Sequence, residues 1–226
     1  MRAKLKKSII ILGIIALINI FFLFLLKVVD VKKIGLYDTT IGLSKINIGV
    51  RDLVSTSKAF DIISTIIMVI AFIIVLAEVA LAVYELIKRK NIEKIDSELW
   101  ALAVTYALLD FIFVFFNYAL IINVRPISEG GKFESSYPST HVLVSLTIFL
   151  TTFPTSSYLL QNKDKKYKYI TYGILTFLSV MIVITRMLSG KHWFTDIVGA
   201  VLISGFLYWL DVTFIIGIKY KRVELF

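Results

Sequence analysis

The sequence has 226 residues, of which 58% are hydrophobic and only 18% are charged, and its formal net charge is +9. Soluble domains contain about 45–50% apolar and about 25% charged residues, and disordered chains are more polar still, so this composition excludes both classes. The complete absence of cysteine also excludes disulfides, thiolate metal sites and thiol nucleophiles.

Six apolar segments follow one another along the chain. A transmembrane helix needs about 20 residues at a rise of 1.5 Å per residue, and the segments meet this requirement, although the fifth is slightly short and Pro154 interrupts the fourth. The sequence therefore predicts an all-α integral membrane protein, a six-transmembrane-helix bundle, with helices over residues 8–26, 60–87, 99–123, 140–160, 169–186 and 194–218.

The first apolar segment resembles a signal peptide because a basic stretch, residues 2–7, precedes it. Its apolar run, residues 8–26, is longer than the 7–15 residues that are usual in a signal peptide, and no small-residue cleavage motif follows. We therefore expect this segment to remain as a signal anchor. The polar loop after it, residues 27–59, is compatible with either a short surface helix or a hairpin.

The distribution of basic residues predicts the orientation. Six spans place both termini on one side, and four basic clusters with 15 of the 25 Lys and Arg residues share that side. Basic residues in short loops mark the cytoplasmic side, so we expect a multi-pass protein of the cell membrane with cytoplasmic termini. The same clusters account for the positive charge by contact with membrane lipids, and no nucleic-acid partner is expected.

Both histidines of the chain, His141 and His192, lie in polar clusters at the predicted outer ends of spans. Asp196 follows His192 by four residues, so a helix that begins near His192 would place the two side chains on one face. A carboxylate there can accept a hydrogen bond from one imidazole nitrogen and leave the other nitrogen as a base or nucleophile. His192 and Asp196 are therefore candidate catalytic residues.

A second polar cluster opens the fourth predicted span. Pro138 suits the first turn of a helix, where its missing N–H needs no partner. Ser139, Thr140 and His141 would then lie at the positive end of that helix, where free backbone N–H groups and hydroxyls can bind an anion. His141, when protonated, can donate a proton to a leaving oxygen.

Arg125 and Arg186 belong to the same outer segments as the two histidines. Arginine stays charged and can bind a tetrahedral oxyanion through two hydrogen bonds, so these residues predict a phosphate site at the outer membrane face. No acidic cluster suited to Mg²⁺ accompanies them, and we expect neither a metal ion nor a cofactor. Guanidinium and amide groups would stabilise the phosphoryl charge instead.

These residues resemble the motifs of the type 2 phosphatidic acid phosphatase family, which shares a catalytic core with vanadium haloperoxidases and glucose-6-phosphatase. The family motifs are Lys-x6-Arg-Pro, Pro-Ser-Gly-His and Ser-Arg-x5-His-x3-Asp. The third motif is matched by Thr185, Arg186, His192 and Asp196, with threonine in place of serine. The second motif is matched by residues 138–141, with threonine in place of glycine.

The first motif is only partly present. Arg125 and Pro126 match its end, but Tyr118 stands at the position of the lysine. Three interpretations follow: Lys132 or Lys191 supplies the missing charge from another direction, Tyr118 donates a neutral hydrogen bond, or the protein binds lipid phosphate without turnover. Glucose-6-phosphatase-like members also lack this lysine, so its loss is compatible with an enzyme.

The resemblance implies a metal-independent phosphatase that forms a phosphohistidine intermediate. His192 would attack phosphorus, Asp196 would orient it, and His141 would protonate the leaving group and later activate water. The phosphoryl oxygens would be bound by Arg125, Arg186, Ser139 and the backbone N–H of Thr140.

The matched motifs define a catalytic core over residues 117–197, within one membrane phosphatase domain over residues 1–226. Residues 1–59 would form the first span and an extracytoplasmic loop, and the active site would face the same extracytoplasmic side. The implied partner is a lipid phosphate monoester or diphosphate, such as undecaprenyl diphosphate, phosphatidic acid or phosphatidylglycerol phosphate. The sequence leaves the oligomeric state open.

Three alternatives remain open from the sequence. A lipid phosphotransferase and a catalytically weak protein that binds lipid phosphate both fit the same motifs. A membrane transporter would need ionisable groups along a route across the bilayer, whereas the charged cluster here lies at one face.

Several residues inside the spans are interpreted structurally. Four acidic residues lie within or at the ends of the spans: Asp61, Glu78, Asp110 and Asp211. Acidic residues within a membrane are usually functional or paired. No regular spacing joins these four into a relay, so we expect them to make helix-to-helix hydrogen bonds or to lie at interfacial positions. Gly199 and Gly205 give the last span a small-residue side that allows close helix packing.

Overall fold

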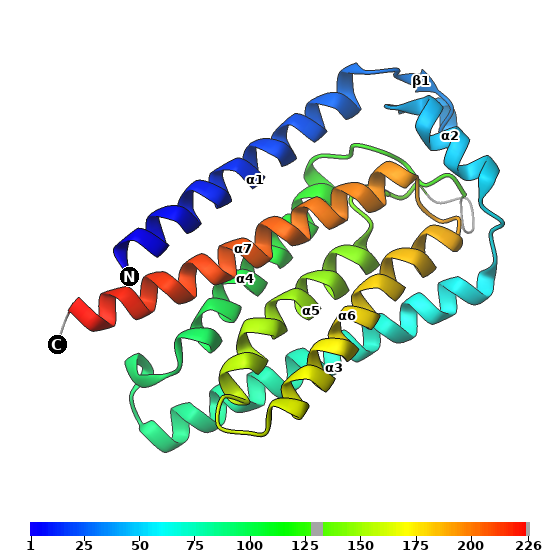
Figure 1. Ribbon diagram of the computed structural model, residues 1–226. Helices are drawn as coiled ribbons and strands as arrows, with labels where there is room; N and C mark the ends of the chain where they lie inside the picture. The colour runs from blue at the N-terminus through cyan, green and yellow to red at the C-terminus, as the bar shows by residue number, and fades with distance from the viewer. Residues whose placement is uncertain (128–132, 225–226) are drawn as a thin grey trace.

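A computed structural model describes residues 1–127 and 133–224. Among these residues, six helices are long and apolar enough to cross a membrane, which confirms the predicted all-helical bundle (Figure 1). They are α1 (Arg2–Val28), α3 (Lys58–Arg89), α4 (Ser97–Val114), α5 (Thr140–Leu159), α6 (Lys165–Leu188) and α7 (Phe194–Glu224).

Shorter elements connect the long helices. A π-helical turn, η3, extends α4 without a break, and two short 3₁₀ helices lie in the loops. The bounds are η1 (Leu36–Asp38), η2 (Ile92–Lys94) and η3 (Phe115–Ala119).

The loop over residues 27–59 contains both structures that its sequence allowed. A two-stranded antiparallel hairpin is followed by a surface helix, with bounds β1 (Lys32–Lys33), β2 (Thr40–Ile41) and α2 (Ser44–Leu53).

Asp30 connects the hairpin to α2. Its carboxylate accepts hydrogen bonds from the backbone N–H of Lys45 at 2.7 Å and from Ser44 Oγ at 2.9 Å. The N–H groups at the start of a helix have no partner within the helix, so this carboxylate satisfies one of them. The hydrogen bond from the Lys45 backbone is the main reason why the pKa of Asp30 lies below its ordinary value.

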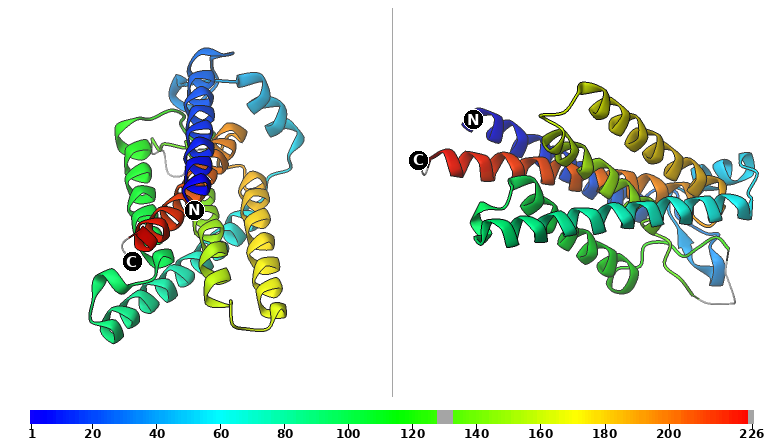
Figure 2. Two further views of the ribbon diagram at one scale, coloured as in Figure 1. Left: turned by 60° about the vertical axis from the view of Figure 1, so that its left-hand side comes forward. Right: turned by 90° about the horizontal axis from the view of Figure 1, so that it is seen from below.

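Helix α7 occupies the centre of the bundle, where α1, α4 and α5 all pack against it (Figures 1 and 2). Helix α6 packs against α5, and α3 lies against both α5 and α6. The core between these helices contains fully buried apolar side chains, among them Leu143, Phe149, Ile182 and Leu207. Lipid surrounds the outside of the bundle, so its outer surface must be apolar in addition to this core.

Helix α5 is the most enclosed span and contains several hydroxyl side chains. Thr151 and Thr155 are buried and donate hydrogen bonds to backbone carbonyls of the preceding turn, at 2.9 and 3.3 Å. Thr147 donates to Ser204 of α7 at 3.1 Å. These bonds explain how a segment with so many polar residues crosses the bundle, since no hydroxyl need face lipid without a partner.

The two chain termini lie at the same end of the bundle, as an even number of spans requires (Figure 1). The hairpin, α2 and the connection between α6 and α7 lie at the opposite end. This second end brings together the polar segments that the sequence singled out.

Gly199 allows the closest packing along α7. A Cβ at this position would lie 2.2 Å from Cε2 of Tyr137, whose side chain is 1% exposed. A Cβ at Gly205, by contrast, would have no atom within 4 Å. The close packing expected at both glycines therefore occurs at Gly199, where it holds the Tyr137 ring against the helix.

We expect Gly199→Ala to lower the free energy of unfolding by about 1–3 kcal/mol, because the new methyl group overlaps a rigid aromatic ring. Gly205→Ala is the matched control, since it adds the same methyl group to the same helix in open space. That control should leave stability unchanged or raise it by up to about 1 kcal/mol through helix propensity. Thermal unfolding of both variants in detergent tests this; equal stabilities would contradict the packing described.

Candidate active site

The polar segments of the sequence meet at the end of the bundle opposite the termini, although they come from distant parts of the chain. The first turn of α3, the segment before α5 and the end of α6 all contribute. Gly190 has φ +70°, a conformation that suits glycine, and lets the chain turn between Arg186 on α6 and His192 before α7.

His192 is 8% exposed, and its two ring nitrogens have different partners. Nδ1 lies 2.9 Å from the carbonyl oxygen of Ser136, and Nε2 lies 3.1 Å from Nη2 of Arg186. A carbonyl can only accept a hydrogen bond and a guanidinium can only donate one, so Nδ1 carries the proton and Nε2 presents its lone pair. The surroundings of His192 thus select one tautomer.

The electrostatic surroundings of His192 favour the neutral ring. Burial lowers the pKa of His192, and the charges of Arg186 and Arg125 act in the same direction, while Asp196 opposes them. A neutral imidazole is the form that can act as a nucleophile.

Asp196 lies beside His192 but makes its hydrogen bonds elsewhere. Its carboxylate is 3.7 Å from His192 Nδ1, which is too long for a hydrogen bond. The Asp196 oxygens instead accept from the backbone N–H of Trp193 at 2.9 Å and from Asn123 Nδ2 at 2.6 Å. The hydrogen bond that the spacing predicted between His192 and Asp196 is therefore replaced by the one to Ser136, because His192 precedes α7 and only Asp196 lies in its first turn.

Two buried asparagines that the sequence did not single out hold the start of α7. The Asn47 side chain, on α2, donates to Thr195 Oγ1 at 3.1 Å and accepts from the Thr195 backbone N–H at 3.1 Å. Asn123 holds the next residue, Asp196, from the segment before α5. An isolated asparagine in a loop has no pattern that would reveal such a role.

Arg186 is 1% exposed and is held by Asp61 from the first turn of α3. Arg186 Nη1 lies 2.5 Å from one Asp61 oxygen, and Lys191 Nζ lies 2.6 Å from the other. One carboxylate thus bridges two cations. The bond to Arg186 joins α3 to α6, so Asp61 makes one of the contacts expected for it, a helix-to-helix hydrogen bond or an interfacial position. Nothing in the sequence identified Arg186 as its partner, because an acid in the first turn of a helix is common.

His141 is the second residue of α5 and faces the same cluster. Its Nε2 is 3.4 Å from Thr65 Oγ1 of α3. Arg125, Arg186, Asp61 and His192 all lie within electrostatic range of the ring. The structure therefore brings the two histidines and the two arginines together at one end of the bundle.

The start of α5 differs slightly from the prediction. Pro138 lies before the helix, after a cis peptide bond, and Ser139 is the N-cap residue. The Ser139 backbone N–H donates to the Asp196 carbonyl at 3.1 Å, which joins the start of α5 to the start of α7. The Ser139 hydroxyl is buried and has no hydrogen-bond partner among the described residues.

Arg125 has an acidic partner that the sequence analysis did not assign. Its Nη1 lies 3.0 Å from a carboxylate oxygen of Glu134, and its backbone N–H donates to the Glu134 carbonyl at 3.2 Å. Its charge still acts on His192. Arg125 is thus close to the cluster but partly neutralised.

Of the three candidate substitutes for the missing lysine, one is found in the cluster among the described residues. Lys191 belongs to the cluster through Asp61. Tyr118, on η3, is 76% exposed and, among the described residues, makes no hydrogen bond to the cluster. Lys132 lies outside the described residues.

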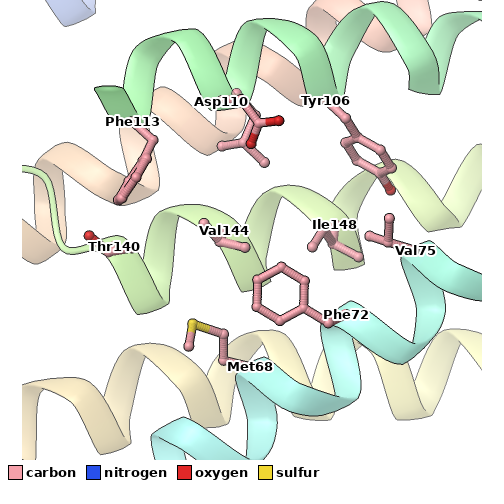
Figure 3. A pocket seen from close by; sticks show the side chains of 10 residues that line it. Met68, Phe72, Val75, Tyr106, Asp110, Phe113, Thr140, Val144 and Ile148 are labelled. Carbon is pink, nitrogen blue, oxygen red and sulfur yellow. The ribbon is translucent and has the colours of Figure 1, made fainter. Parts of the chain in front are cut away.

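An apolar cavity of about 330 Å³ lies directly beside the cluster, between α3, α4 and α5 (Figure 3). Thr140, the first residue of α5, lines its outer end, and Ile148 lines it two turns further along the same helix. Met68 and Phe72 of α3 face it from the other side. The polar site and the apolar cavity therefore share the start of α5.

The chain is similar to a known protein family and to a solved structure. Residues 98–217, more than half of the chain, match the family model described as the PAP2 superfamily. No curated protein sequence matches the chain. A solved structure, described as the first transmembrane PAP2 type phosphatidylglycerolphosphate phosphatase from Bacillus subtilis, is similar with a TM-score of 0.62 and 16% identity, covering 89% of this chain and 94% of that one. At this identity the likeness shows the fold alone.

The bridge between Asp61 and the two cations leads to a stability prediction. Asp61→Ala should lower the free energy of unfolding by about 3 kcal/mol, because it leaves the buried charge of Arg186 without its carboxylate. Asp61→Asn should cost less, since an amide oxygen can still accept from Arg186. Asp52→Ala, at an exposed acid on α2, is the control. Unfolding in detergent measures all three, and an Asp61→Ala loss no larger than that of the control would refute the bridge.

Proposed function

Because the chain belongs to the PAP2 superfamily and is a multi-pass membrane phosphatase, we propose that it hydrolyses a phosphate monoester or diphosphate on a lipid, with His192 as the nucleophile. The observation that carries this proposal is the pair of contacts made by the His192 ring, from which its tautomer follows. Ser136 holds the proton on Nδ1, and Nε2 directs its lone pair toward the guanidinium that would bind the phosphoryl group.

The geometry supports a two-step reaction. In the first step His192 Nε2 forms a bond to phosphorus while the bond to the leaving oxygen breaks, and His141 supplies the proton that this oxygen takes up. In the second step His141 removes a proton from water, which attacks phosphorus and releases phosphate from His192. The Ser136 carbonyl at 2.9 Å and the Asp196 carboxylate at 3.7 Å stabilise the positive charge that His192 acquires on attack.

The phosphoryl oxygens are proposed to bind to the surrounding donors. Arg186, Arg125, the Ser139 hydroxyl and the backbone N–H of Thr140 would each donate, and Lys191 would supply the charge absent at Tyr118. Asp61 holds Arg186 and Lys191 side by side, and we propose that one phosphoryl group binds to both of these positive charges. No step in this scheme uses a metal ion.

The apolar cavity supports a lipid substrate. It begins at Thr140, beside the proposed phosphate site, so a lipid chain could enter it while the phosphate remains at the end of the bundle. Undecaprenyl diphosphate, phosphatidic acid and phosphatidylglycerol phosphate all have this arrangement of a polar group and an apolar chain. We propose that residues 1–226 form one such domain with its catalytic core over residues 117–197.

The basic clusters support an orientation with both termini in the cytoplasm and the active site on the outside. Lipid phosphates of the outer leaflet would then reach the site without crossing the membrane.

We expect His192→Ala to abolish phosphate release from these lipids, because it removes the imidazole that would form the covalent intermediate. His141→Ala should slow the second step, so that phosphate bound to His192 accumulates and can be trapped in acid-quenched protein. Lys163→Ala is the control, because Lys163 lies in the connection between α5 and α6, and this connection is at the end of the bundle that carries the termini. The assay uses purified protein in detergent with EDTA.

Undiminished turnover in His192→Ala would refute the assignment of the nucleophile. A requirement for added Mg²⁺ in the wild-type protein would refute the metal-free scheme.

Two variants test which residue takes the place of the lysine that is missing from the first motif. Lys191→Gln should lower kcat/KM about 100-fold, the usual effect of removing one group that stabilises an oxyanion. Tyr118→Phe should leave kcat/KM unchanged, because the Tyr118 side chain is exposed and makes no hydrogen bond to the cluster among the described residues. The reverse pattern of the two losses would assign the contact to Tyr118 instead.

A further inference from the structure

Asp110 is an acidic residue inside a membrane-spanning helix, on the wall of the apolar cavity (Figure 3). Among the described residues it has no hydrogen bond and no ion pair. The other acids within the spans do have partners: Glu78 accepts from Tyr106 at 2.7 Å, and Asp211 accepts from Thr105 at 3.5 Å. The Asp110 side chain is exposed along this open cavity and not buried between helices. A carboxylate within a membrane is costly and usually serves binding or function, so a ligand that occupies the cavity is the partner considered for Asp110.

The depth of Asp110 along the cavity suggests which part of a ligand it meets. In Figure 3 its carboxylate lies across the cavity from Val144 and Ile148, four and eight residues after Thr140 on α5. At a rise of 1.5 Å per residue, this level is about 6–12 Å below the start of the helix. If a phosphate lies at that start, Asp110 faces the atoms that directly follow the phosphate ester.

The hydrogen-bonding capacity of the Asp110 carboxylate favours some lipid substrates over others. An ionised carboxylate can accept hydrogen bonds but cannot donate one, so it is satisfied by a hydroxyl or an ammonium group. Ester carbonyls and alkene carbons offer no such donor, and a second phosphate would be repelled. The remaining lining of the cavity is mainly apolar and suits a hydrocarbon chain.

We infer that Asp110 is a specificity-determining residue, which accepts a hydrogen bond from a hydroxyl or ammonium group next to the phosphate ester of the lipid substrate. This inference rests on the proposed function and narrows its substrate class. It favours single-chain lipid phosphates with a free donor in their backbone over prenyl diphosphates and diacyl lipids.

Matched lipid pairs test this inference. Oleoylglycerol phosphate with a free 2-hydroxyl is compared with its 2-O-methyl ether, and a sphingoid-base phosphate is compared with its N-acetyl form. The first pair differs by the loss of the hydroxyl proton. The second pair differs by the replacement of a charged ammonium group with a neutral amide N–H, which is a weaker donor to a carboxylate. A hydrogen bond to a charged group predicts that kcat/KM of the wild-type protein favours the free hydroxyl in the first pair and the ammonium group in the second about tenfold or more.

Two variants connect this preference to Asp110. Asp110→Leu should reduce the ratio of kcat/KM within each pair to near 1. Asp110→Asn keeps a neutral acceptor, so it should retain part of the preference for the hydroxyl and lose the preference for the ammonium group, which separates the two donors. Phe113→Leu alters the same cavity wall without a polar group and should leave the ratios as in the wild-type protein.

The outcomes separate this inference from the proposed function. Hydrolysis of both members of each pair at equal rates by the wild-type protein, or an unchanged ratio in Asp110→Leu, would overturn the role of Asp110 and leave the phosphatase proposal intact. Absence of phosphate release from every lipid tested would overturn the phosphatase proposal and this inference together.

Discussion

The buried carboxylate of Asp196 is the interaction on which the rest of the site depends. It is fully buried and accepts hydrogen bonds from Trp193 and Asn123, and its backbone carbonyl accepts from Ser139. The starts of α5 and α7 are therefore held to each other and to the segment before Arg125. A charge-assisted network of this kind is worth more than its separate bonds, because each partner fixes the position of the next.

This network explains how two helix ends can position His192 without a direct bond from Asp196. Ser136 is close to Ser139 in sequence, so the tie between Ser139 and α7 also places the Ser136 carbonyl beside the imidazole. Asp196 acts on His192 in two ways, through the backbone of Trp193 and through its charge at 3.7 Å. Orientation and electrostatics are thus supplied by different groups.

Positive charge is concentrated at the same end of the bundle, and neighbouring acidic side chains neutralise part of it. Asp61 neutralises part of the charge of Arg186 and Lys191, and Glu134 does the same for Arg125. Without these acids the arginines would repel one another in a region of low dielectric constant. The apolar cavity begins beside this cluster, so the first turn of α5 lies between the proposed phosphate site and the proposed site of the lipid chain.

The sequence by itself determined the six spans and the residues of the polar segments, because the length of an apolar run and the spacing of a motif are local properties. Asn47 and Asn123 belong to no motif, so nothing in the sequence marked them as residues that hold the start of α7. Only the tertiary structure decided that Ser136 rather than Asp196 accepts from His192, and that Asp61 bridges Arg186 and Lys191. These partners come from other helices or from the backbone, and a backbone carbonyl is the same in every residue. The packing of α3 against α6, and of α5 against α7, is what brings them within reach.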